Sequence, residues 1–128
     1  MRKILIVDDN RDDIEITRIV LEERGWDVQV EASRNAEKAL DGLRTGEDLP
    51  SLILLDLNIP GMGGIDCLQQ IRADQSLHSI PVIMVSSSSF EMDEKKAYDA
   101  GADFFLYKHL DIDRYGEHLD AALKRLMV

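Results

Sequence analysis

Five short runs of aliphatic or aromatic residues recur along the chain, and they constrain its fold more than any other feature. The runs span residues 4–7, 28–30, 52–55, 81–85 and 104–107. Three of the first four are nearly continuous in hydrophobicity, which is typical of strands in a parallel sheet that is covered on both faces. Parallel strands need long crossover connections, and these are usually helices. The runs therefore predict strands that alternate with helices.

The segments between the runs carry apolar residues at helical spacing. Stripes cover residues 14–21 and 36–43, and they stop at Gly25 and Gly46, as helices commonly do. A third stripe covers residues 65–71. Ser88 followed by Glu91 forms a capping box that predicts a fourth helix ending at Gly101, and a fifth helix is expected over residues 111–126.

Five strand–helix units in series predict one α/β domain over residues 1–128. A chain of 128 residues with 45% hydrophobic content is long enough for one core and too short for two full-sized domains. The expected architecture is a flavodoxin-like, doubly wound sheet of five parallel strands in the order 2-1-3-4-5, with five helices on both faces. In that order the first and third strands are neighbours at the topological switch point.

Charge and composition indicate which kinds of partner the chain can bind and in which compartment it is expected. Acidic residues outnumber basic ones by 25 to 15, giving a net charge of −10 that repels nucleic acid phosphates and anionic lipid surfaces. No apolar run approaches the roughly 18 residues of a membrane helix. Cys67 is the only cysteine, so it excludes an internal disulfide and is expected to be a small buried side chain. We expect a cytoplasmic protein that binds neither nucleic acid nor membranes.

Reactive side chains fall at the ends of four predicted strands. Asp8 and Asp9 end the first, Asp56 the third, Ser86 the fourth and Lys108 the fifth. Each has an ordinary explanation alone, as a turn, a helix cap or a surface charge. Their recurrence at four carboxyl ends is better explained by one site, because ligands of open α/β sheets bind beyond those ends.

Two further acidic residues lie nearby in the sequence. Asp12 and Asp13 fall in the first turn of the predicted first helix, where carboxylates interact favourably with the helix dipole. This explanation is sufficient for both residues, and we expect no site role for them.

The predicted site combines three carboxylates with an amine and a hydroxyl. Like charges so close either raise a carboxyl pKa or require a hard cation, and Mg²⁺ suits a site with few protein oxygens better than Ca²⁺ does. A carboxylate beside Mg²⁺, with Lys108 and Ser86 at hand, can attack or hold a phosphoryl group. The chain lacks the glycine-rich motifs that bind nucleotides.

These residues resemble the receiver domains of bacterial two-component response regulators, in particular single-domain, chemotaxis-regulator-like ones. The resemblance covers essentially the whole chain and is carried by residues 4–10, residues 54–62, Ser86 and residues 101–108. It implies that Asp56 is the phosphoacceptor, with Mg²⁺ bound by Asp56 and Asp9, by Asp8 largely through water, and by the Asn58 carbonyl. It also assigns a switch to Ser86 and Phe105, in which the Ser86 hydroxyl and Lys108 bind the phosphoryl group.

The resemblance implies a function in phosphotransfer signalling. A sensor histidine kinase or histidine phosphotransfer protein would phosphorylate Asp56, and altered binding to a downstream protein would carry the signal. Transfer to another histidine in a relay is a close variant. The chain would not be an enzyme beyond its own phosphotransfer and dephosphorylation. Receivers often pair through the face from the fourth to the fifth helix, so a homodimer there is an alternative to a monomer.

Two other functions compete with this one. An aspartyl-nucleophile phosphatase would share the carboxylate and Mg²⁺, but it normally needs a second acid two residues after the nucleophile, where this chain has Asn58. A constitutive interaction domain that has lost phosphorylation is the other alternative, although the expected reactive residues are all present.

One departure from the family pattern concerns the residue after Lys108. His109 stands where the family usually has a proline, commonly after a cis bond. Because a cis bond before a non-proline residue costs about 2.5 to 4 kcal/mol, we expect a trans Lys108–His109 peptide.

Overall fold

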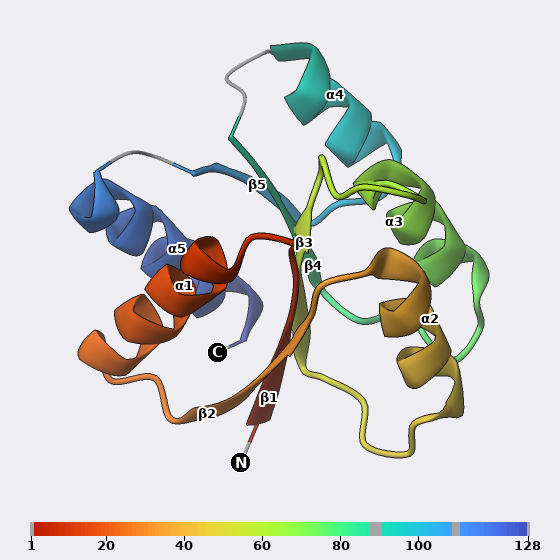
Figure 1. Cartoon of the computed structure of the whole chain (residues 1–128), viewed down its shortest axis with the longest axis horizontal. Coiled ribbons are helices and arrows are strands. Elements are labelled where there is room, and N and C mark those ends of the chain that lie inside the picture. The colour runs from red at the N-terminus through yellow and green to blue at the C-terminus, as the bar shows by residue number, and fades with distance from the viewer. Residues whose placement is uncertain (1, 88–90, 109–110, 128) are drawn as a thin grey trace.

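The computed structural model describes residues 2–87, 91–108 and 111–127 and forms one five-stranded parallel sheet with helices on both faces (Figure 1). The strand order is β2-β1-β3-β4-β5, which confirms the predicted doubly wound fold. The strands are β1 (Arg2–Val7), β2 (Val28–Ser33), β3 (Leu52–Asp56), β4 (Val82–Ser86) and β5 (Phe104–Tyr107). Strand β2 extends three residues beyond the predicted run, because residues 31–33 continue the pairing with β1.

Five helices connect or follow the strands. They are α1 (Arg11–Glu23), α2 (Ala36–Thr45), α3 (Gly64–Ala73), α4 (Glu91–Asp99) and α5 (Ile112–Leu126). Figure 1 shows α1 and α5 on one side of the sheet and α2, α3 and α4 on the other. Ser88 of the predicted capping box lies outside the described residues. Among the described helices, none is both long enough and apolar enough to cross a membrane.

The central strands divide the core into two layers. On β1, Leu5 and Val7 pack with the layer under α2 and α3, whereas Ile4 and Ile6 pack with the layer under α1 and α5. All five residues of β3 are buried. Burial on both faces is the reason for the continuous hydrophobicity of these strands. It leaves polar side chains only at the strand ends.

Cys67 belongs to the layer under α2 and α3. Its side chain lies on α3 and is 1% exposed. Burial raises the pKa of the thiol to about 11, with a smaller contribution from the charge of Glu37. The predicted role of Cys67 as a small buried side chain is confirmed.

We predict that Cys67 of the folded chain reacts at least about a hundredfold more slowly with a thiol-specific chromogenic disulfide at pH 8 than in denaturant. The reactive species is the thiolate, and a raised pKa combined with burial limits both its formation and its contact with the reagent. Stopped-flow absorbance with and without urea measures the two rates. Equal rates would show that the thiol is accessible in the folded chain.

Candidate functional site

The predicted site residues lie together at the carboxyl edge of the sheet. Asp56 and Ser86 are the last residues of β3 and β4, and Asp8 and Lys108 directly follow β1 and β5. One carboxylate oxygen from each of Asp8, Asp9 and Asp56 lies within 4.8 Å of the others. The pairing of β1 with β3 produces this cluster, because it places Val7 opposite Leu55, one residue before each aspartate.

Two matching turns orient the buried carboxylates. Asp8 Oδ1 accepts a hydrogen bond from the Asn10 amide at 2.9 Å, and Asp56 Oδ1 accepts one from the Asn58 amide at 3.1 Å. Each aspartate therefore has one oxygen held by the backbone two residues later, as in Asx turns. Asn58 is itself exposed, and its backbone belongs to the turn beside Asp56. The turns fix the carboxylates before any ligand binds.

The loop after Asp56 requires glycine where α3 begins. A Cβ atom on Gly64 would lie 2.4 Å from the Asp56 carbonyl oxygen and 2.8 Å from Cα of Leu57. The Gly64 amide instead donates to the Leu57 carbonyl at 3.1 Å, and Glu37 accepts from the Met62 amide at 2.8 Å. These contacts hold the loop that carries Asn58 against the end of β3.

Lys108 contacts three carboxylates through one ammonium group. Its Nζ atom lies 2.6 Å from Asp8 Oδ2, 2.9 Å from Asp13 Oδ2 and 3.3 Å from Asp56 Oδ2. Burial by itself lowers the pKa of Lys108, but the hydrogen bonds to Asp8 and Asp13 and the charge of Asp56 outweigh it and raise the pKa above its ordinary value. Lys108 is therefore a permanent cation at neutral pH.

The carboxylates still outnumber this cation. Burial raises the pKa of Asp8, and the hydrogen bonds from Lys108 and from the Asn10 amide only partly oppose that change. A raised carboxyl pKa is the expected sign of an acidic group in a desolvated and negatively charged place. The ligands here are all oxygen atoms, and the carboxylates that supply them outnumber the single ammonium. Such a site suits a hard divalent cation.

Asp13 is a site residue that sequence reasoning missed. The helix dipole was a sufficient explanation for it, yet its carboxylate is an ion-pair partner of Lys108. Helix periodicity places Asp13 on the face of α1 that carries Thr17, four residues later, but it does not indicate a partner for the carboxylate. Thr17 faces α5, where its Oγ1 atom lies 2.9 Å from the Tyr115 hydroxyl.

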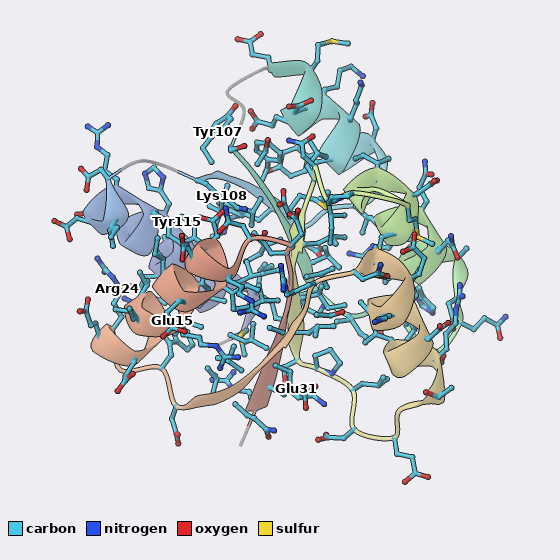
Figure 2. All side chains as sticks on the ribbon, in the orientation of Figure 1. Glu15, Arg24, Glu31, Tyr107, Lys108 and Tyr115 are labelled. Atoms are coloured by element: carbon cyan, nitrogen blue, oxygen red, sulfur yellow. The ribbon has the colours of Figure 1, made fainter. Side chains whose placement is uncertain are left out.

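Ser86 ends β4, the strand next to the one that Asp56 ends, and Phe105 lies within the neighbouring strand β5. Ser86 is completely buried, and its carbonyl accepts a hydrogen bond from the Lys108 amide at 2.8 Å. Phe105 is 6% exposed, with its ring edge-on to Tyr107 at a centroid distance of 5.2 Å. Burial raises the pKa of Tyr107, and the charges of Glu94 and Glu91 on α4 add to the effect. Tyr107, labelled in Figure 2, thus interacts with acidic residues of α4.

A small recess lies below the acidic cluster. It has a volume of about 10 Å³ and is bordered by Asp8, Asp56, Thr17, Lys108 and Tyr115. That volume accommodates at most one water molecule. The recess is too small for an organic ligand. His109 and its peptide bond to Lys108 lie outside the described residues, so the trans geometry stays a prediction.

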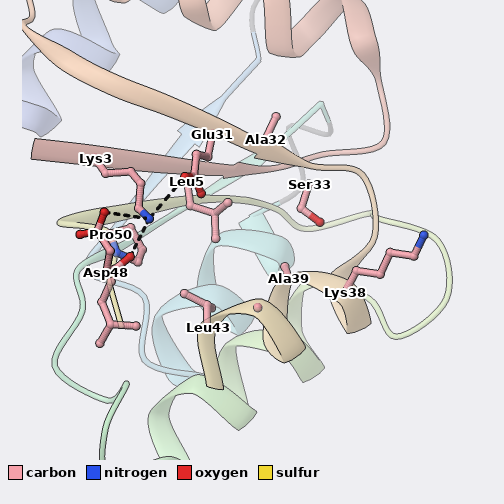
Figure 3. Close-up of a pocket in the computed structure, with 12 residues that line it drawn as sticks. Lys3, Leu5, Glu31, Ala32, Ser33, Lys38, Ala39, Leu43, Asp48 and Pro50 are labelled. Carbon is pink, nitrogen blue, oxygen red and sulfur yellow. Dashed lines mark hydrogen bonds and ion pairs between the residues drawn. The ribbon is translucent and has the colours of Figure 1, made fainter. Parts of the chain in front are cut away.

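A larger groove extends from Lys3, near the start of β1, to Ser33 at the end of β2 (Figure 3). It has a volume of about 190 Å³ and runs between β2 and α2. Lys3 Nζ donates to the Asp48 carbonyl at 2.6 Å and lies 3.5 Å from Glu31 Oε1. The Lys3 charge is thus already paired within the groove, and we assign the groove no role.

Comparison with known proteins identifies the family. Residues 4–120 match the response regulator receiver domain. The regulator RpaA of Synechocystis is 34% identical over 98% of this chain, which spans 50% of RpaA. CpxR of Escherichia coli is 35% identical, and the chain likewise spans half its length. The response regulator DivK of Brucella anthropi is 29% identical, with 95% of this chain and 96% of DivK covered.

Solved structures agree with the sequence relatives. The phosphorylated cyanobacterial phytochrome response regulator RcpA has a TM-score of 0.88 at 30% identity, covering 98% of this chain and 94% of RcpA. The Mn²⁺-bound form of the response regulator Rcp1 has a TM-score of 0.86 at 27% identity, covering all of this chain and 96% of Rcp1. With its strand order and its acidic cluster at the carboxyl edge, the chain belongs to the receiver domain family of two-component response regulators.

Proposed function

We propose that residues 1–128 act as one receiver domain that accepts a phosphoryl group on Asp56 from the phosphohistidine of a sensor kinase or a histidine phosphotransfer protein. The phosphorylated chain then signals by altered binding to a downstream protein. The observation that carries this proposal is the position of Asp56, which ends β3 within the group of three carboxylates and lies 3.3 Å from the Lys108 ammonium.

Mg²⁺ is the metal that this donor set fits best. The carboxylates of Asp8, Asp9 and Asp56, with the backbone carbonyl of Asn58, would hold it, and the 4.8 Å spacing of the carboxylate oxygens supports such a site. When bound, Mg²⁺ offsets the negative charge that Asp56 presents to an incoming phosphoryl group. The existence of a Mn²⁺-bound form of Rcp1 supports the binding of a divalent cation by this chain.

The protein side chains account for the transfer step. A carboxylate oxygen of Asp56 attacks the phosphorus atom, so a P–O bond forms as the P–N bond to histidine breaks, and the histidine nitrogen keeps the electron pair. No general base is needed because the attacking group is a carboxylate, which has no proton to lose. Lys108 neutralises charge on the phosphoryl oxygens, and the Ser86 hydroxyl donates a hydrogen bond to them.

A change in the position of Ser86 would alter the surface that binds a partner. The hydrogen bond from the Lys108 amide to the Ser86 carbonyl couples the ends of β4 and β5, and Phe105 lies on β5 in contact with Tyr107. Movement of Ser86 toward the phosphoryl group would therefore reposition the Phe105 ring and the adjacent α4. The surface formed by α4 and α5 carries exposed apolar side chains that a partner could contact. They are Met92, Tyr98 and Ile112. A homodimer through the same face is one outcome, and transfer to a second histidine is another.

We predict that wild-type chain incubated with Mg²⁺ and acetyl phosphate gains the mass of one phosphoryl group, and that Asp56→Asn gains none. The amide lacks the anionic oxygen that attacks phosphorus. Intact-mass spectrometry of quenched samples measures the gain, and Asp66→Asn serves as a control because Asp66 is an exposed aspartate of α3.

Each alternative gives a different result in this experiment. Rapid release of phosphate without mass gain would indicate a phosphatase-like enzyme. Neither gain nor release would indicate an interaction domain that is no longer phosphorylated. A gain in Asp56→Asn equal to wild type would place the phosphoacceptor elsewhere.

We predict that Asp9→Asn weakens Mg²⁺ binding by about tenfold or more, since it removes an anionic ligand from the cluster. Isothermal titration calorimetry at fixed ionic strength measures the affinity. Asp12→Asn is the matched control, because it makes the same charge change at an exposed position of α1. Equal weakening by both substitutions would attribute the effect to net charge alone.

We also predict that Mg²⁺ affinity begins to fall at a higher pH than an ordinary aspartate would require. The pKa of Asp8 is raised, mainly by burial, so as pH decreases the proton competes with the cation sooner. Titrations at a series of pH values from 8 down to about 5 would test this. An affinity that stays constant until the pH approaches 4 would contradict it.

A further inference from the structure

The three contacts of Lys108 use all the donors of its ammonium group. A lysine has three N–H donors, and three carboxylate oxygens surround this one, from Asp8, Asp13 and Asp56. The Asp56 contact, at 3.3 Å, is the longest. Lys108 is thus held most closely by two carboxylates that do not accept the phosphoryl group. Movement of the ammonium toward a phosphoryl group on Asp56 would weaken its contact with Asp8 or with Asp13.

The exposure of the three carboxylates indicates which of their contacts with Lys108 breaks most easily. The side chain of Asp13 is 32% exposed, against 6% for Asp8 and 10% for Asp56. A carboxylate that loses its partner is stabilised by water when it is exposed and is left uncompensated when it is buried. The Asp13 contact is therefore the least costly to break. The Asp8 contact is retained.

The backbone of Asp13 is anchored, which limits how far its carboxylate can follow Lys108. Asn10 Oδ1 accepts from the amides of Asp12 and Asp13, at 2.9 and 3.2 Å, and caps the helix. One turn later, Thr17 contacts the Tyr115 hydroxyl at 2.9 Å, and both residues are buried. Figure 2 shows Lys108 and Tyr115 close to the start of α1. Movement of Lys108 toward Asp56 would separate it from Asp13.

We propose that Asp13 is a positioning residue that restrains Lys108 in the unphosphorylated chain and thereby slows phosphorylation of Asp56. This inference rests on the proposed function of the same site. Asp13 acts through Lys108 and does not touch the phosphoryl group. Removal of its charge frees one donor of Lys108 for the phosphoryl oxygens.

The test compares rates of phosphorylation by acetyl phosphate at saturating Mg²⁺ and 0.15 M salt, measured by intact-mass spectrometry. Saturating metal removes any effect on metal affinity, and the salt screens distant charges beyond about 8 Å. The variants are Asp13→Asn, Asp12→Asn, Lys108→Ala and the double variant Asp13→Asn with Lys108→Ala. Asp12 is exposed and lies in the same helical turn, so it is matched to Asp13 in charge and position. Thermal melts monitor folding, with Lys108→Met replacing Lys108→Ala if that variant is unfolded.

We expect Asp13→Asn to accelerate phosphorylation about two- to fivefold, the range typical of a partly exposed ion pair. Asp12→Asn should change the rate by less than half as much. In the Lys108→Ala background, Asp13→Asn should have no effect, because the group through which Asp13 acts is absent. A purely structural role for Asp13 would not produce this dependence on Lys108.

Other results overturn the inference. An unchanged or slower Asp13→Asn variant would show that Asp13 does not restrain Lys108. Equal acceleration by Asp12→Asn, or acceleration that persists without Lys108, would indicate a general charge effect. If wild type gains no phosphoryl group, the proposed function fails and the Asp13 inference fails with it. A normal wild-type gain combined with any of the results above rejects the role of Asp13 alone.

Discussion

The rest of the site depends on the repulsion between carboxylates at the carboxyl edge of the sheet and on its partial neutralisation by Lys108. The carboxylates of Asp8, Asp13 and Asp56 contact one ammonium. The carboxylate of Asp9 lies beside those of Asp8 and Asp56. Such an arrangement costs stability, because buried like charges disfavour joint ionisation. It persists because the strands beneath it are held by burial on both faces. The same unbalanced charge that costs stability creates affinity for a divalent cation.

The sequence predicted those parts of the structure that follow from periodicity and topology. Continuous apolar runs indicated parallel strands, and the strand order then brought Asp8 and Asp56 to adjacent strand ends. No side-chain geometry was needed for that step, because parallel strands all end at the same edge of the sheet. The predicted end of β2 was three residues too early, because hydrophobicity indicates only the buried part of a strand. Glu31 and Ser33 are polar, since β2 is an edge strand whose burial is incomplete.

Asp13 could not be placed from its local sequence pattern. An acidic residue in a first helical turn has a sufficient explanation in the helix dipole, and nothing in the sequence near it indicates a partner 95 residues away. The contact arises because the side chain of Lys108, which follows β5, reaches the first turn of α1, which is a tertiary property. The packing of Phe105 also depends on tertiary structure. The sequence identified the aromatic residue, but its edge-on packing with Tyr107 depends on how β5 meets α4.

Lys108 connects the site to several strands and to one helix through its own contacts. Its ammonium contacts residues that follow β1, end β3 and open α1, while its backbone amide is bonded to the end of β4. A change in charge on Asp56 therefore alters forces on four strands and one helix through a single residue. On the α1 side, the Thr17–Tyr115 contact continues to α5, and on the β5 side the Phe105–Tyr107 pair continues to α4. These two sets of contacts leave Lys108 in different directions, so the proposed phosphorylation of Asp56 has contacts leading toward both α4 and α5.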